Sequence, residues 1–102
     1  MGKLVRDRIP EIIAAKGETA EVRVLDDGAY ITALLDKLLE EVHELRDADI
    51  EHWLNEAADV YEVLLTILAQ QGLDAIDLES ATIRKRETHG AFARRWWWEP
   101  VP

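Results

Sequence analysis

Two pairs of acidic residues with helical spacing are the most chemically informative feature of this sequence. Glu41 and Glu44 are three residues apart, and Glu56 and Asp59 repeat that spacing further along the chain. Residues three apart on an α-helix lie on the same side, about 5–6 Å apart at Cβ. Two antiparallel helices would therefore bring all four carboxylates together. Such a group is costly to assemble without a cation, and hard oxygen donors suit Mg²⁺ or Mn²⁺.

The helices that must position these acids are strongly apolar. An advance of about 100° per residue gathers one apolar stripe on the first helix: Ile31, Leu34, Leu35, Leu38, Val42 and Leu45. Glu41 lies at the edge of this stripe with Lys37 beside it, whereas Glu40 falls on the opposite side and is expected to face water. The second helix is apolar on two sides, and Glu56 and Asp59 lie on the second of them. A helix that is apolar nearly all round is usually buried, and unpaired buried acids are costly. The alternative is that all four acids are solvated, as is usual on helices.

Length and composition indicate one globular domain, residues 1–102. The chain is 48% apolar and 32% charged, and a chain of this size commonly buries about 60–70% of its unfolded surface. The absence of cysteine excludes disulfides and thiolate metal sites, and we expect a cytoplasmic location. No apolar run approaches the roughly 20 residues of a membrane span, so no membrane partner is expected.

The net charge of −9 is unevenly distributed. Residues 17–83 hold seventeen acids and three bases, a balance of −14, whereas residues 1–16 carry +2 and residues 84–102 carry +3. An acidic middle argues against nucleic-acid binding, which requires a basic face. The distribution fits a site in which acids hold a cation and the basic ends hold an anion, although acidic soluble proteins are common without any such site.

The predicted fold is all-α: an antiparallel helical bundle with a short N-terminal helix and an extended segment, completed by oligomerisation. The predicted helices are Pro10–Lys16, Gly28–Asp47, Ile50–Gln71 and Ala75–His89. Their N-terminal caps are expected at Asp26 or Asp27, at Asp49 and at Asp74. Ala20–Leu25 is predicted to be an extended segment or a short edge strand. Three long helices cannot cover both apolar sides of the second one, which is why oligomerisation is expected.

Four motifs, spread nearly end to end, carry a family resemblance. They are Lys3–Pro10 (KLVRDRIP), Lys37–Glu44 (KLLEEVHE), Glu56–Val60 (EAADV), and Lys85 followed by His89–Phe92 (HGAF). Together they resemble the MazG-like, all-α nucleoside triphosphate pyrophosphohydrolases. The similarity is greatest to the small branch called phosphoribosyl-ATP pyrophosphohydrolase-like.

The resemblance implies Mg²⁺-dependent cleavage between the α- and β-phosphates, giving a nucleoside monophosphate and pyrophosphate. It implies Glu41, Glu44, Glu56 and Asp59 as metal ligands and catalytic residues, and assembly as a homodimer or homotetramer. Basic residues are also needed to hold the phosphates of the nucleotide substrate. The candidates are Lys3, Arg6, Lys37, Lys85, Arg94 and Arg95. The base and sugar of the substrate do not follow from the resemblance.

Two other functions are open at this point. A di-iron bundle would need a Glu-x-x-His motif on each of two helices, and only Glu40 and His43 provide one. A non-catalytic helical assembly module would use the tail Ala91–Pro102, which contains Trp96, Trp97 and Trp98. Because large apolar patches usually mark contacts, we expect this tail to turn back after Gly90 and dock on the helices. Docking would carry Arg94 and Arg95 towards the acids.

Overall fold

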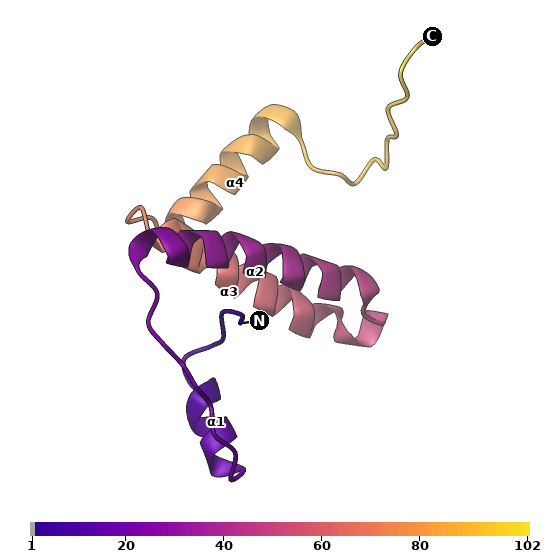
Figure 1. Cartoon of the computed structure of the whole chain (residues 1–102). Helices are drawn as coiled ribbons and strands as arrows, with labels where there is room; N and C mark the ends of the chain where they lie inside the picture. Colours follow the sequence, from indigo (N-terminus) through magenta and orange to yellow (C-terminus); the bar gives the residue numbers. More distant parts are fainter. Residues whose placement is uncertain (1) are drawn as a thin grey trace.

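The computed structural model describes residues 2–102, and the regular elements of this part of the chain are helical (Figure 1). They are α1 (Ile9–Ala15), α2 (Asp27–Asp47), the 3₁₀ turn η1 (Ile50–His52), α3 (Trp53–Ala69) and α4 (Ala75–His89). The all-α prediction is confirmed. Residues 20–25 form no strand, so of the two predicted alternatives the edge strand is wrong. None of the described helices has the length and apolarity needed to cross a bilayer.

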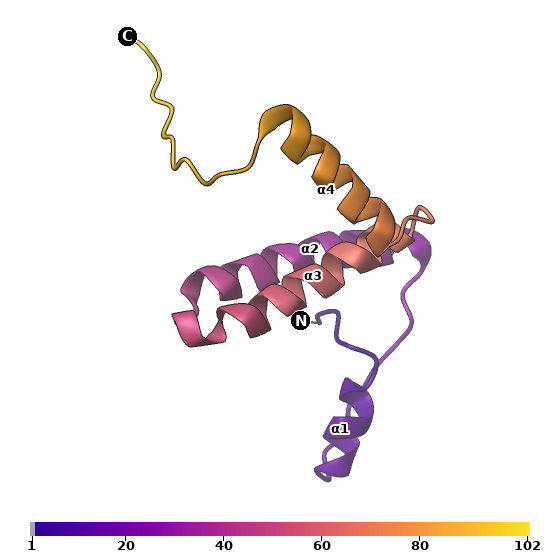
Figure 2. The same ribbon diagram turned by 180° about the vertical axis from the view of Figure 1, so that it is seen from behind.

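The centre of the molecule is an antiparallel hairpin of α2 and α3, which lie side by side in both views (Figures 1 and 2). Leu34 on α2 is 2% exposed and is the one buried apolar side chain among residues 2–102. The predicted apolar stripe of α2 is only partly covered. Leu38 and Leu45 are half-buried, whereas Ile31, Leu35 and Val42 are exposed, as is Leu39 beside them. One face of the hairpin therefore remains apolar and open.

The connection between α2 and α3 differs from the prediction. A continuous helix from Ile50 with an Asp49 cap was expected, but the chain first makes the η1 turn, and Asp49 forms no side-chain cap hydrogen bond. Instead, the indole Nε1 of Trp53 donates to the carbonyl oxygen of Ala48 at 3.1 Å. The aromatic side chain thus joins the two ends of the turn, which a short acidic side chain could not do.

The other helix ends follow the expected chemistry. Asp26 accepts a hydrogen bond from the backbone N–H of Ala29 at 2.9 Å and caps α2. Gly72 follows α3 with φ of +74°, a conformation that favours glycine. This conformation lets the N–H of Leu73 donate to the carbonyl of Leu68 at 3.1 Å. Asp74 and Asp77 cap each other at the start of α4, at 2.9 and 3.0 Å.

The C-terminal part of the chain leads away from the hairpin (Figures 1 and 2). Beyond α4 the tail extends further outwards, and Trp96, Trp97 and Trp98 are 83%, 84% and 93% exposed. The predicted return of the tail onto the helices is therefore wrong for the single chain. The guanidinium of Arg94 stacks over the ring of Trp96, 5.4 Å from its centroid, so the tail's basic and aromatic groups contact each other instead.

A single chain leaves far more surface exposed than its size requires. Its accessible area is 9459 Å², whereas a folded monomer of 11.7 kDa typically exposes about 5,900 Å². The radius of gyration is 17.8 Å, against about 13 Å for a compact domain of this length. The core expected from composition does not form within one copy. Likewise α3, predicted to be buried, contains no fully buried residue.

Candidate functional site

The hairpin brings the two acid pairs together. Glu41 and Glu44 lie one turn apart on α2, and Glu56 and Asp59 lie one turn apart on α3. Each of the four offers a carboxylate oxygen, and these oxygens lie within 4.8 Å of one another. The i, i+3 spacing produces the pairs, and the antiparallel packing of α2 on α3 makes them face each other. We call these four residues the acid cluster.

Burial makes the acid cluster unusual. Glu41 is 7% exposed, and the Oε2 atoms of Glu41 and Glu56 are buried without any hydrogen-bond partner. A buried acceptor with no donor costs about 1–3 kcal/mol, and more if it is charged. Two such oxygens among four acids suit a cation that accepts oxygen ligands. The donor set, four carboxylates and no nitrogen or sulfur, fits Mg²⁺ or Mn²⁺.

Glu44 completes the acid cluster from its exposed side. A hydrogen bond with Glu41 raises the pKa of Glu44 above its ordinary value, and the negative charge of Glu41 and slight desolvation raise it further. Two carboxylates this close repel each other when both are charged. A divalent cation between them would relieve that repulsion.

Lys37 lies against the acid cluster from within α2. Its Nζ is 3.2 Å from Glu41 Oε1 and 3.4 Å from Glu40 Oε2. Partial burial opposes the charge on Lys37, but the hydrogen bond to Glu41 and the two carboxylate charges outweigh it and raise the pKa of Lys37. Glu40 is therefore not the water-facing residue that was predicted. It is half-buried and paired with Lys37.

The N-terminal segment supplies two more basic groups. Arg6 Nη2 is 2.6 Å from Asp59 Oδ1, and Lys3 Nζ is 3.9 Å from Glu40 Oε1. Arg6, Lys37, Glu41 and Asp59 line one groove of about 540 Å³. This groove also includes residues that sequence reasoning did not single out, among them Leu4, Tyr30, Glu62 and Thr66. Thr66 lies about two turns beyond Asp59 on α3, and this spacing of seven residues was an available signal.

Of the six predicted basic residues, Arg6 and Lys37 line this groove, and Lys3 lies beside it through its pair with Glu40. The other three lie away from it. Lys85 is on α4, and Arg94 and Arg95 are in the tail. None of the three forms an ion pair with any residue in the described part of the chain. The single chain therefore gathers Lys3, Arg6 and Lys37 around the acids, but not Lys85, Arg94 or Arg95.

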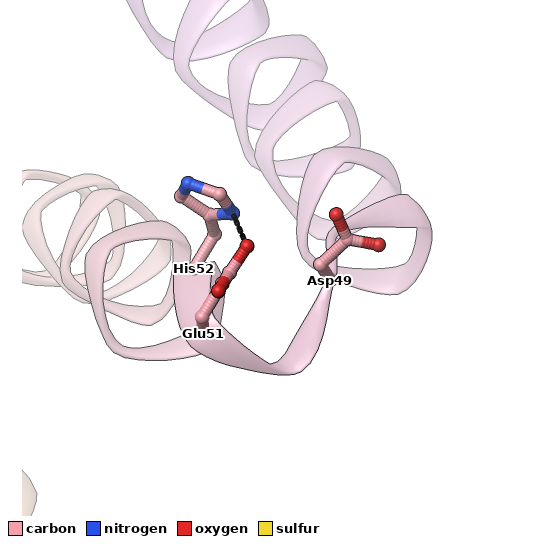
Figure 3. Close-up of side chains that lie close together, drawn as sticks. All are labelled: Asp49, Glu51 and His52. Carbon is pink, nitrogen blue, oxygen red and sulfur yellow. Dashed lines mark ion pairs between the residues drawn. The ribbon is translucent and has the colours of Figure 1, made fainter.

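A second group of possible ligands lies at the turn between α2 and α3 (Figure 3). Asp49, Glu51 and His52 place one donor atom each within 4.8 Å of one another, and all three are exposed. His52 Nδ1 lies 4.0 Å from Glu51 Oε1. A hollow of about 650 Å³ joins this turn to the acid cluster, because its lining includes Asp49 and His52 as well as Glu44 and Glu56. Sequence reasoning missed this group, although the D-x-E-H spacing was visible.

The di-iron alternative gains little from this geometry. Glu40 and His43 do line the same hollow, but Glu40 pairs with Lys3 and Lys37. The groups that converge around the acid cluster are carboxylates without histidine, whereas a di-iron site of this type needs a histidine from each of two helices.

Comparison with known proteins gives one similar sequence. A protein of Mycolicibacterium smegmatis, described as uncharacterized, is 59% identical to this chain over 49 residues. The match covers 48% of this chain and 50% of that relative, so the chain spans about half the length of the protein it matches. No family model matches the sequence, and no solved structure matches it. The resemblance to the MazG-like enzymes stays a prediction.

Proposed function

We propose that this chain is a divalent-metal-dependent nucleoside triphosphate pyrophosphohydrolase. It would cleave between the α- and β-phosphates and release a nucleoside monophosphate and pyrophosphate. The observation that carries the proposal is the acid cluster: four carboxylates from two helices, within 4.8 Å, with two buried oxygens that lack a partner. The sequence motifs that resemble the MazG-like enzymes support the same reading.

In this proposal Glu41, Glu44, Glu56 and Asp59 hold Mg²⁺, with Mn²⁺ as a substitute. The bound ion supplies charge neutralisation at the phosphate oxygens and acidifies a coordinated water. The carboxylates of the cluster orient the attacking water by accepting its hydrogen bonds. Partial burial of Glu41, Glu56 and Asp59 keeps the local dielectric low, which strengthens each of these interactions.

The basic residues of the groove would hold the phosphates. Lys37 is fixed beside Glu41, so its charge lies next to the position that the metal would occupy. Lys3 and Arg6 approach from the N-terminal segment. Phosphoryl transfer depends mainly on positioning and charge neutralisation, and a groove that places Arg6 and Lys37 beside Asp59 and Glu41 provides for both.

We further propose that the enzyme acts as a homodimer or homotetramer. The excess of accessible area over that of a compact monomer is larger than the roughly 800 Å² per partner of a standard interface. The open face of α2, formed by Ile31, Leu35, Leu39 and Val42, is a contiguous surface for a second copy. In such an assembly Lys85, Arg94 and Arg95 would reach the groove of a neighbouring copy.

A non-catalytic assembly module is the second candidate, and the exposed tryptophans of the tail favour it. An assembly module of this kind would associate with other chains but would not catalyse any metal-dependent reaction. The two candidates therefore differ in one measurement, the release of pyrophosphate from nucleotides in the presence of Mg²⁺.

The test is a screen of pyrophosphate release across canonical, deoxy and modified nucleoside triphosphates, with Mg²⁺, with Mn²⁺ and with a chelator. We expect metal-dependent release that Glu41→Gln and Asp59→Asn abolish. Glu79→Gln removes one acid from α4, outside the acid cluster, and should leave the rate unchanged. Release that is absent for every nucleotide, or unaffected by the cluster variants, would refute the enzymatic proposal.

A further inference from the structure

One carboxylate of the acid cluster is already bound by a cation of the protein itself. Arg6 and Asp59 are 53 positions apart in the sequence, and their ion pair is the shortest between the N-terminal segment and the hairpin, at 2.6 Å. The same Asp59 offers an oxygen to the cluster. Asp59 is thus shared between a guanidinium and the position proposed for the metal.

The two basic neighbours of the cluster differ in how firmly they are held. The Lys37 side chain is 17% exposed and is bound by two carboxylates of its own helix. The Arg6 side chain is 58% exposed, and a single nitrogen contacts a single oxygen of Asp59. An exposed ion pair of this kind contributes little, at most about a fivefold change in an equilibrium constant. Arg6 is also carried by residues 2–6, which have no regular secondary structure, so its side chain can move without disturbing a helix.

We propose that the Arg6–Asp59 ion pair is a latch that a divalent cation displaces. Arg6 neutralises Asp59 while the cluster holds no metal. A divalent ion among the four carboxylates cancels the negative potential that holds the guanidinium, and two cations so close repel each other. The released guanidinium remains in the groove, next to Lys37, where an anionic ligand would bind.

The consequence is an ordered site: metal first, then phosphate. Before metal binds, Arg6 is occupied and unavailable to a phosphate group. After metal binds, it becomes a free donor in the same groove. This inference rests on the proposed function for the identity of the cation, but its test needs only the metal and the protein.

The chain provides a matched control. Arg8 forms an exposed ion pair with Glu11 at 2.8 Å, within α1 and its preceding residue, and neither residue belongs to the acid cluster. Arg6→Gln and Arg8→Gln remove the same charge from positions two residues apart. Arg6→Lys keeps the charge and serves as the conservative variant. Circular dichroism establishes that each variant keeps its helices.

The experiment measures the affinity for Mn²⁺ alone by calorimetry, for full-length wild type and the three variants. Loss of the competing guanidinium should tighten Mn²⁺ binding by about 3- to 5-fold in Arg6→Gln, the upper part of the range expected for an exposed pair. Arg8→Gln should bind as wild type does, and Arg6→Lys should lie close to wild type. Repeating the titration near 1 M salt, where the Debye length is about 3 Å, should shrink the difference, because the exposed Arg6–Asp59 pair is itself screened.

A second readout follows the guanidinium directly. In wild-type protein, the Arg6 side-chain N–H groups should exchange with water more slowly without metal than after Mg²⁺ is added. Weaker Mn²⁺ binding in Arg6→Gln would overturn the latch, because Arg6 would then orient Asp59 for the metal rather than compete with it. Equal affinities in wild type and Arg6→Gln would also overturn it. No binding by any of the four proteins would overturn the proposed function, and the latch with it.

Discussion

The hairpin and the C-terminal region are both helical, but they are specified in different ways. α2 and α3 contain the two buried side chains, Leu34 and Glu41, and form the ion pairs with Lys3 and Arg6 that link distant parts of the chain. In α4 and the tail no residue is fully buried. α4 is held by its own Asp74–Asp77 capping box and by the glycine at position 90. The hairpin is thus defined by tertiary contacts, whereas α4 is defined by local ones.

The largest expected difference between the two regions is in activity. Glu41→Gln or Asp59→Asn should reduce Mg²⁺-dependent pyrophosphate release by more than about 100-fold, because even residues that only support metal ligands cost 10- to 100-fold when changed. The same substitution at Glu79 on α4 should have no effect. Initial rates at saturating Mg²⁺ provide the comparison. A similar loss in Glu79→Gln would show that α4 also contributes to the site.

The next difference is in stability. Leu34→Ala removes the most buried apolar side chain of the hairpin and should lower the free energy of unfolding by about 2–5 kcal/mol. Ile76→Ala, at a position on α4 that is 75% exposed, should change it by no more than about 0.5 kcal/mol. Urea unfolding followed by circular dichroism measures both. A large cost at Ile76, growing with protein concentration, would place α4 inside an assembly.

Removal of the tail tests whether the C-terminal region serves the hairpin. Deletion of residues 91–102 should leave the thermal midpoint unchanged, because the tail leads away from α2 and α3 (Figure 1). We expect KM to rise by about tenfold, the effect of losing one charge-assisted hydrogen bond of about 1.5 kcal/mol. Sedimentation before and after truncation reports the change in assembly. A lower midpoint with unchanged KM would make the tail a structural clasp, and the phosphate roles of Arg94 and Arg95 would be wrong.

The smallest expected effect is a pair of opposite pH dependences. The shared hydrogen bond with Glu41 raises the pKa of Glu44, so its contribution to stability is present in acid and is lost as pH rises through that pKa. The backbone N–H of Asp77 lowers the pKa of Asp74, so its contribution is lost as pH falls through that lower pKa. Unfolding free energies of the metal-free protein, measured from acid to neutral pH, should show both of these pH dependences. Glu44→Gln should remove the first dependence only, and Asp74→Asn the second only. Saturating Mg²⁺ should abolish the first even in wild type.

Much of the fold was predictable because it depends on local signals. Asp26 and Asp74 marked the starts of α2 and α4, and Gly72, which adopts a φ of +74°, marked the end of α3 to within a few residues. The connection between α2 and α3 was less predictable. There, the hydrogen bond of Trp53 to Ala48 replaces the cap expected at Asp49, and nothing in the local propensity of tryptophan signals that bond.

The candidate site was predictable in part for the same reason. The i, i+3 spacing fixes which acids share a helix face, so Glu41, Glu44, Glu56 and Asp59 could be grouped from sequence. The pairing of Arg6 with Asp59 could not, because 53 positions separate them and residues 2–6 have no periodicity that orients a side chain. The predicted position of the tail was wrong for a different reason. Its apolar composition indicates a contact but does not specify which surface makes that contact.

The short connection between the two helices also sets a limit on how this sequence can vary. The turn from Ala48 to Trp53 sets how α3 is rotated about its own axis relative to α2, and this rotation makes the four residues of the acid cluster face one another. The hydrogen bond between Trp53 and Ala48 closes that turn. Each residue inserted or deleted at the start of α3 rotates the side chains that follow by about 100° about the helix axis. Such a change would carry Glu56 and Asp59 away from α2, even though every side chain of the cluster was retained. Related sequences that keep this site should therefore tolerate substitution in the turn far better than a change in its length.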